Sequence, residues 1–390
     1  MVAAGLGVLP SVYSQSPGDQ QAITTAVPFL MINPDARTGG MGDLGVATEA
    51  DAASMQWNVG KLAFAPKDMS FNVSYTPWLR NLVPDINLAY LGFYKKIGER
   101  VTVGASLKYF SLGDITFTDQ NGTNIGIYTP NEFSLDAGAS LKLSEYWSGG
   151  IAFRFIYSNL TLGQIVGGAA TNAGMAGSGD FGFYYQNPDK KLFKKPVTWR
   201  FGFAFTNIGS KIRYSDVDPD GDFIPTNLRI GASNTIELDK FNKLTWAIEF
   251  SKLLVPSSNV ALDTAGNQEV RVTSPIVGIF TSWGDAPAGF YGEMLEITFA
   301  TGLEYWYNNL FRASAGFFYE PQVSGNRTYF TLGAGVRYKV FGLDFSYLLP
   351  TVQRHPLENT LRFSLSFNFD KMGKGNKKKK GKNTAPTGGA

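Results

Sequence analysis

The chain has 390 residues, a formal net charge of +3, 17% charged residues and 14% aromatic residues. Charged residues are scarcer than the roughly 25% of ordinary soluble domains, yet no apolar run reaches the ~18 residues of a transmembrane helix. The absence of cysteine excludes disulfides and thiol chemistry. A closed β-barrel is the remaining fold that spans a membrane with its backbone polar groups paired.

The N-terminus precedes any barrel pattern. Residues 1–14 are apolar from Val2 to Leu9 and end near Ser14, which resembles the remnant of a secretory signal peptide. No Lys or Arg stands before the apolar stretch, so a disordered N-terminus stays open as the alternative. Residues 15–66 show no alternation and form a separate N-terminal segment before the first predicted strand.

Fourteen stretches alternate between apolar and polar residues, as strands with one lipid-facing and one wet side do. Leu361–Phe369, for example, has apolar residues at odd positions and Arg362, Ser364, Ser366 and Asn368 at even ones. About nine tilted residues cross a bilayer core. The predicted strands are 69–78, 86–96, 100–112, 132–144, 146–158, 180–187, 196–208, 226–237, 242–253, 294–307, 310–320, 328–339, 341–349 and 359–369.

The connections between these stretches support the same fold. Long links near 113–131, 159–179, 209–225 and 254–293 alternate with short ones, as outer loops and periplasmic turns do in outer-membrane barrels. A soluble β-sandwich would carry a polar outer face, whereas the apolar face here is long and aromatic. We therefore predict an all-β fold, a fourteen-stranded antiparallel transmembrane barrel over residues 67–370, whose last strand closes against the strand near 69–78.

The predicted inward positions carry charges of both signs, which favours internal ion pairs or hydration over a one-sign substrate pathway. These positions are Lys108, Asp136, Lys142, Arg154, Arg200, Arg229, Glu249, Glu296, Glu304, Arg312, Glu320, Arg337, Asp344 and Arg362.

The last residues, 371–390, include the basic run Lys377–Lys380 in a Gly-rich context without aromatics. We expect a disordered periplasmic tail that contacts anionic outer-membrane lipid or an acidic partner, or is merely solvated. No aromatic residues are interleaved with the lysines, so nucleic acid is not an expected partner.

Three sequence features are candidates for a chemical role. Gly40–Gly45 fits GxGxxG, but a turn-forming stretch precedes it and no βαβ unit follows, so a compact turn is the better interpretation. The lone histidine, His355, has no accompanying nucleophile motif, and no catalytic residue, cofactor or transition-metal site is predicted. Asp216, Asp218, Asp220 and Asp222 loosely match a calcium loop, but position 227 is Asn where the bidentate Glu belongs, so a solvated outer loop is favoured.

The loop Leu254–Glu293 is the longest and is rich in apolar residues. Long loops of this kind are usually functional, either as a contact surface for a partner or as a lid over the barrel mouth, and both interpretations stay open. The candidate contact residues are Ile276, Ile279, Phe280, Trp283, Phe290 and Tyr291.

The stretch Asn33–Thr48, followed by Asp51, Ser54–Asn58 and Leu62-Ala63, resembles the N-terminal signature of FadL-like outer-membrane barrels. It departs from their Asn-Pro-Ala-Gly-Leu-Ala at Asn58–Ala63. The segment PDARTGGMGDLGVAT resembles the PorV family of the Bacteroidetes type IX secretion system more closely. The resemblance implies that residues 15–66 plug the lumen, through candidate residues Arg37, Gly40, Gly42, Asp43, Asp51 and Asn58.

The same resemblance implies a secretion function without catalysis. The expected partners are the type IX translocon barrel, the C-terminal signal domains of secreted cargo and the surface attachment complex, with the outer loops as the contact surface. The alternative that the FadL-like signature supports is an outer-membrane channel for hydrophobic small molecules.

Overall fold

The computed structural model describes residues 22–370 apart from 81–82, 84, 119–121, 164, 167–168, 193, 217–219, 257–259, 263–267, 271–273 and 353–354. The predicted signal remnant (1–14) and basic tail (371–390) lie outside the described residues.

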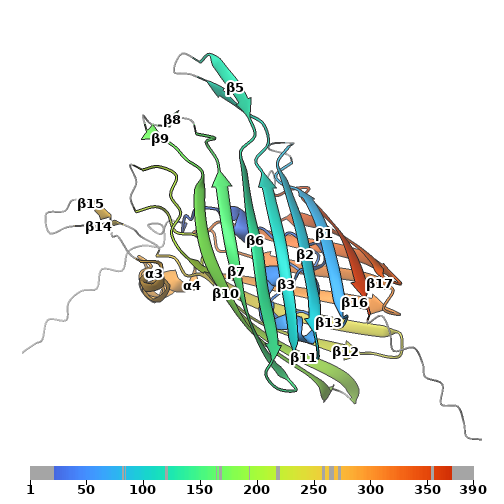
Figure 1. The fold of residues 1–390 in the computed structure, drawn as a ribbon. Coiled ribbons are helices and arrows are strands. Elements are labelled where there is room, and N and C mark those ends of the chain that lie inside the picture. Colours follow the sequence, from blue (N-terminus) through green and yellow to red (C-terminus); the bar gives the residue numbers. More distant parts are fainter. Residues whose placement is uncertain are drawn as a thin grey trace, which may run out of the picture.

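The main sheet is a closed antiparallel barrel of fourteen strands, as predicted (Figure 1). The alternation of apolar and polar residues produces it, because each strand can hydrogen-bond to two neighbours while turning its apolar face to lipid. The strands are β1 (Met69–Pro77), β2 (Asn87–Ile97), β3 (Val101–Ser111), β6 (Asn131–Lys142), β7 (Trp147–Asn159), β10 (Gly174–Leu192), β11 (Lys195–Gly209), β12 (Asn227–Glu237), β13 (Asn242–Leu253), β16 (Ile297–Tyr307), β17 (Phe311–Tyr319), β18 (Thr328–Tyr338), β19 (Phe341–Pro350) and β20 (Leu361–Phe369).

The barrel closes where the sequence predicts. Strand β1 pairs with β20 in a register that places Phe71 opposite Phe367 and Ser74 opposite Ser364. The apolar members of these pairs face outward, and the serine hydroxyls meet inside at 2.7 Å. The seam therefore continues the lipid-facing and lumen-facing surfaces of the rest of the wall.

The structure differs from the sequence prediction mainly in strand β10 and in the long loops. Strand β10 is much longer than the predicted 180–187, because glycines at its start and lysines at its end interrupt the alternation. The outer loops carry three two-stranded sheets: β4 (Ile115–Thr118) with β5 (Asn124–Tyr128), β8 (Ile165–Val166) with β9 (Ala169–Ala170), and β14 (Val260–Leu262) with β15 (Gln268–Val270). The longest loop also contains helices α3 (Pro275–Thr281) and α4 (Gly289–Met294).

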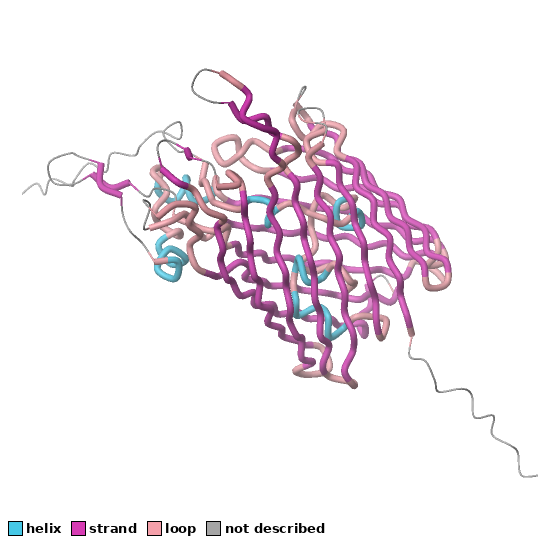
Figure 2. The backbone as a smooth tube through the Cα atoms, turned by 45° about the horizontal axis from the view of Figure 1, so that its top comes forward, coloured by secondary structure: helices cyan, strands magenta, loops and turns pink. Residues whose placement is uncertain are grey.

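The N-terminal segment, residues 22–66, lies within the ring of strands (Figure 2). It consists of short helices joined by turns: η2 (Pro28–Met31), α1 (Ala36–Gly39), α2 (Ser54–Trp57) and η3 (Val59–Phe64). Helix α1 packs on β18, β19 and β20, while η3 packs on β6, β7 and β10 across the barrel. The segment thus contacts opposite sides of the wall. No helix among the described residues is long and apolar enough to cross a membrane.

Candidate functional site

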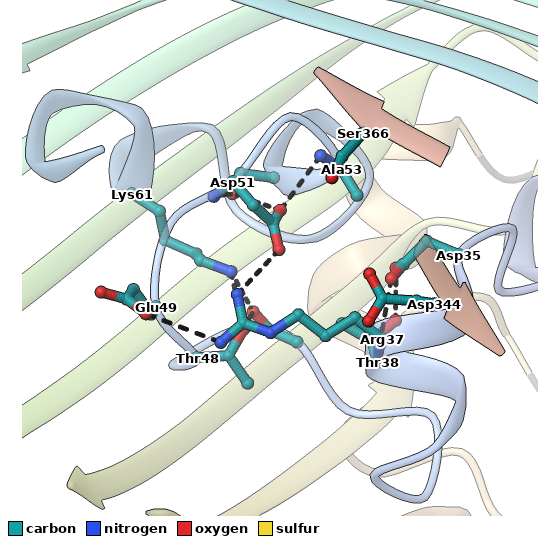
Figure 3. Close-up of polar contacts among 12 residues, drawn as sticks. Asp35, Arg37, Thr38, Thr48, Glu49, Asp51, Ala53, Lys61, Asp344 and Ser366 are labelled. Atoms are coloured by element: carbon teal, nitrogen blue, oxygen red, sulfur yellow. Dashed lines mark hydrogen bonds and ion pairs between the residues drawn. The ribbon is translucent and has the colours of Figure 1, made fainter. Parts of the chain in front are cut away.

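Arg37 connects the N-terminal segment to the barrel wall. Its Nε and Nη2 each lie 2.9 Å from a carboxylate oxygen of Glu304 on β16, a bidentate pair. Within the segment, the guanidinium also contacts Asp51 at 3.2 Å and Glu49 at 3.7 Å, and Figure 3 shows Arg37 reaching between these two carboxylates. The structure therefore brings the predicted residues Arg37 and Asp51 together, with Glu304 as the wall partner.

Asp43 makes a second connection on the opposite side of the segment. Its carboxylate accepts hydrogen bonds from Tyr329 at 2.6 Å and from Arg362 at 3.1 Å, and it pairs with Asn33 within the segment. Asp43 has a φ of 59°, in the left-handed region that Asp tolerates better than most residues. Two ion pairs thus hold the segment to the barrel wall, and the segment contributes the cation of one, Arg37, and the anion of the other, Asp43.

Glycines allow the segment to approach the wall closely. Gly42 has a φ of 84°, and a Cβ there would lie 2.7 Å from the Phe317 carbonyl oxygen of β17. Its N–H donates to Thr331 Oγ1 at 2.8 Å. A Cβ on Gly40 would likewise meet Ser314 Oγ at 2.6 Å. Both predicted glycines lie where only hydrogen fits beside the wall.

The backbone at the end of the GxGxxG stretch binds a carboxylate of the barrel wall. The N–H groups of Gly45 and Val46 both donate to Glu249 Oε2 of β13, at 2.7 Å and 2.8 Å. Arg229 on β12 pairs with the other oxygen of this carboxylate at 2.9 Å. The stretch follows α1 rather than a strand, so the structure agrees with its interpretation as a compact turn.

Asn58 forms the remaining predicted contact. Its side-chain oxygen accepts the Gly60 N–H at 2.9 Å, and its amide nitrogen donates to Val46 O and to Phe183 O of β10. Sequence reasoning gave no role to Lys61, which is fully buried and donates to Gly45 O at 2.7 Å. The available sequence signal was that Lys61 lies within Asn58–Ala63, where this chain departs from the FadL-like motif.

Inward charges pair with one another, as the mixed signs predict. Arg154 contacts Asp136 at 2.6 Å and Asp180 at 3.0 Å, and Arg312 contacts Asp344 at 3.0 Å. Buried charges of this kind persist because each has a partner of opposite sign. These pairs join strands of the wall to one another rather than lining a one-sign pathway.

Two cavities flank the N-terminal segment and share no lining residue. One measures about 540 Å³ and is polar, with Arg37, Glu49, Asp51, Arg200 and Asp344 among its lining residues. The other measures about 640 Å³ and is mainly apolar, bounded by Phe29, Trp57, Trp78, Phe110 and Phe318 among others. Segment residues line both cavities, so the segment lies between them.

The candidate contact residues of the longest loop gather on α3, on α4 and on the turn between them. Phe290 and Phe280 are 82% and 74% exposed, and Ile276, Trp283 and Tyr291 are also exposed. Ile279 is less exposed than the others and is half-buried. We call this set, together with the exposed Val277 and Met294, the α3–α4 surface.

A buried lysine fixes the α3–α4 surface to the barrel. Lys252 at the end of β13 is 4% exposed and pairs with Glu293 of α4 at 2.9 Å and with Glu296. Glu293 also accepts the Ala286 N–H at 3.0 Å, and the Trp283 ring lies 5.7 Å from Lys252 Nζ. Burial raises the pKa of the Glu296 carboxyl, while the Lys252 ammonium opposes that rise. Sequence reasoning missed Lys252.

The other candidates do not converge on a site. His355 lies in the β19–β20 loop, where its Nδ1 accepts the Leu357 N–H at 3.1 Å. Of the calcium-like acidic residues, Asp218 lies outside the described residues, and Asp222 pairs through its backbone with Ile212. Among the residues that the structure describes, no three His, Asp or Glu side chains are grouped to hold a metal.

Comparison with known proteins identifies the family. The family model of the type IX secretion system protein PorV matches residues 15–260, more than half of the chain. The chain belongs to the PorV family. PorV-family membership and the closed barrel together make it an outer-membrane component of a type IX secretion system. No curated protein sequence matches the chain.

A solved structure of a membrane channel agrees with the PorV-family chain in fold. A deltaS2S3 mutant of the TodX monoaromatic hydrocarbon channel is 13% identical, with 86% of this chain and 99% of that chain covered and a TM-score of 0.52. The Ralstonia pickettii toluene transporter TbuX is 12% identical, covering 87% and 99%, at a TM-score of 0.47. A Pseudomonas aeruginosa FadL homologue is 11% identical, covering 90% and 100%, at 0.42. At such identity, the TodX likeness shows the barrel fold alone.

Proposed function

We propose that this chain is a binding and shuttle barrel. In this proposal, it associates with the type IX translocon barrel, receives secreted cargo through the cargo's C-terminal signal domain, and passes it to surface attachment subunits. The α3–α4 surface contacts the translocon. Residues 15–66 plug the lumen, and the basic tail after residue 370 lies in the periplasm beside outer-membrane lipid.

The observation that carries the proposal is the α3–α4 surface. Large apolar side chains there stay in water unless a partner covers them, and clustered exposed aromatics are typical of protein contact sites. Residues 275–294 contain two charges, Asp285 and Glu293, and Lys252 pairs with Glu293. The surface therefore suits an uncharged, apolar partner surface.

The N-terminal segment supports a shuttle rather than a conduit for protein. Ion pairs at Arg37 and Asp43 fasten the segment to the wall, and it separates the two cavities. A cavity of about 640 Å³ suits a small molecule, not a polypeptide domain. Cargo handling in this proposal therefore takes place at the outer loops and not through the barrel.

The test is co-purification with the translocon from native membranes. Phe280→Ser combined with Phe290→Ser should remove most of the co-purified translocon, since central aromatic anchors each contribute about 2 kcal/mol or more. Val352→Ser, at an exposed apolar residue of another outer loop, serves as the matched control. Heat-modifiable gel mobility should be unchanged in all variants. Full retention of the translocon by the double variant would contradict the assignment of this surface.

The apolar cavity favours a second candidate, a FadL-like channel for hydrophobic small molecules. Phe29, Trp78 and Phe110 line it, which suits an apolar ligand. If this function holds, the purified protein should bind a fluorescent fatty acid, and Phe29→Asp should weaken that binding by about tenfold or more. Binding that is equal in the variant and the parent would exclude this cavity as the ligand site.

A further inference from the structure

The hairpin formed by β4 and β5 stands apart from the barrel on its outer side (Figure 1). Its strands pair only with each other, with Ile115 opposite Tyr128 and Thr116 opposite Ile127, and no third described strand joins them. Ile127 is 65% exposed and Ile115 is 39% exposed. An isolated two-stranded hairpin is marginally stable in water, and a third strand normally completes it.

The base of this hairpin is braced. Leu112 N–H donates to Pro130 O at 3.0 Å, and Asp114 N–H donates to a carboxylate oxygen of Asp85 in the β1–β2 loop at 2.7 Å. The Thr129 hydroxyl donates to the Asp114 side chain at 2.6 Å. The hairpin is therefore held at a defined place above the barrel wall.

The strands of the β4–β5 hairpin carry none of the charges or prolines that normally prevent strand pairing, and their one irregularity is a shift of register between Phe117 and Thr118. Natural edge strands carry Lys, other charges or Pro, which obstruct the approach of another strand. Residues 115–118 read ITFT and residues 124–128 read NIGIY, without a charge or a proline. Both stretches are rich in residues with high β-propensity.

The opposite end of the barrel provides the contrast. The hairpin that joins β10 to β11 also extends beyond its neighbours, since β10 pairs with β7 only as far as Tyr185. Its exposed residues include Lys190, Lys191, Lys194, Lys195 and Pro196. This chain therefore places lysines and a proline on one projecting hairpin and none within the strands of the other.

We propose that the β4–β5 hairpin accepts an extended segment of secreted cargo as an added β-strand. Main-chain hydrogen bonds to the free edge would supply the affinity, and they tolerate varied cargo sequences because every residue except proline offers the same backbone groups. This inference rests on the proposed function for the existence of cargo. It assigns cargo to a surface separate from the α3–α4 surface.

Site-specific crosslinking tests the inference, because the chain contains no cysteine. Asn124→Cys in the full-length protein carries a benzophenone maleimide in cells that export an epitope-tagged cargo, and Val352→Cys is the control on another outer loop. Two pairs of substitutions separate strand addition from apolar contact. Thr116→Lys with Thr118→Lys adds edge charges, whereas Ile115→Thr with Ile127→Thr removes apolar side chains but keeps β-branched residues.

We expect the label at residue 124 to crosslink cargo about tenfold more than the label at residue 352. The lysine pair should abolish that crosslink and the threonine pair should retain it. Loss with the threonine pair alone, equal crosslinking at both labels, or a crosslink to a second copy of this chain would each overturn the inference. Translocon co-purification is measured in the same membranes. If translocon co-purification persists while cargo crosslinking fails, only the inference about the hairpin is refuted. If the parent protein does not co-purify the translocon, the proposed function is refuted.

Discussion

The Arg37 guanidinium and the Glu304 carboxylate face each other across two 2.9 Å hydrogen bonds, although 267 positions separate them in the chain. The Glu304 side chain is 2% exposed and that of Arg37 is 12% exposed. Because the pair is largely removed from water, loss of Arg37 would leave the Glu304 carboxylate with only the more distant Arg312, 3.7 Å away.

Arg37→Ala should therefore destabilise the protein by about 3 kcal/mol, the lower end of the cost of breaking a buried ion pair, because Arg312 remains 3.7 Å from Glu304. The measurement is the denaturant midpoint of the barrel in detergent. Lys67→Ala breaks a pair with Asp370 whose side chains are 38% and 73% exposed, so it should cost less than about 1 kcal/mol. Equal midpoints for the two variants would argue against a stabilising role of Arg37.

Gly42→Ala should destabilise the protein for two reasons, its φ of 84° and the Phe317 carbonyl oxygen 2.7 Å from the new Cβ. We expect a loss above about 1 kcal/mol. Gly98→Ala is the control, since Gly98 has a φ of 79° in the turn between β2 and β3 and nothing within 4 Å of a Cβ placed there. The difference between the two variants in unfolding free energy isolates the close approach of the segment to the wall.

Lys252→Met should release helix α4. The substitution leaves Glu293 and Glu296 without their cation, at a local cost of about 3–5 kcal/mol. Limited proteolysis in detergent should then cut within residues 275–296, and translocon co-purification should fall although every exposed aromatic remains. Lys243→Met, on the same strand but in an exposed 3.7 Å pair with Glu237, should leave both unchanged. An intact loop in the Lys252 variant would show that α4 does not depend on this pair.

The outer loop that contains His355 should loosen on acidification. Burial, followed by the charge of Arg327, lowers the pKa of His355 below its ordinary value of 6.5, and the neutral ring accepts the Leu357 N–H. The unfolded loop binds the proton more readily, so this stabilisation is present above pH 6.5 and is lost as the pH falls through the lowered pKa. The hydrogen-exchange protection factors of residues 355–360, which are corrected for the intrinsic pH dependence of amide exchange, should fall with acid in the parent. His355→Phe should remove that pH dependence.

The strands were predictable because lipid and water impose opposite demands on successive residues. Strand β13 spans Asn242–Leu253, the predicted range, whereas β10 exceeds its prediction at both ends. Gly174, Gly177 and Gly179 have no side chains, so this part of the strand shows no alternation of apolar and polar residues. The β4–β5 hairpin was missed for a related reason, since it has no buried face to impose alternation.

The candidate site was predictable in part. The family signature pointed to Arg37 and Asp43, yet their wall partners, Glu304 and Arg362, lie hundreds of residues away and no local pattern connects them. Lys252 reads as an ordinary charge at a strand end. Only the folded loop brings Glu293 and Glu296 to it, so its importance depends on tertiary structure.

The contact between Asp43 and Arg362 has a consequence for assembly. These residues are 319 positions apart, and Arg362 belongs to β20, the strand that closes the ring. Synthesis delivers the N-terminal segment first and β20 last. The contact between Asp43 and Arg362 therefore forms only once the last strand is in place. Attachment of the N-terminal segment at Asp43 depends in this sense on completion of the ring.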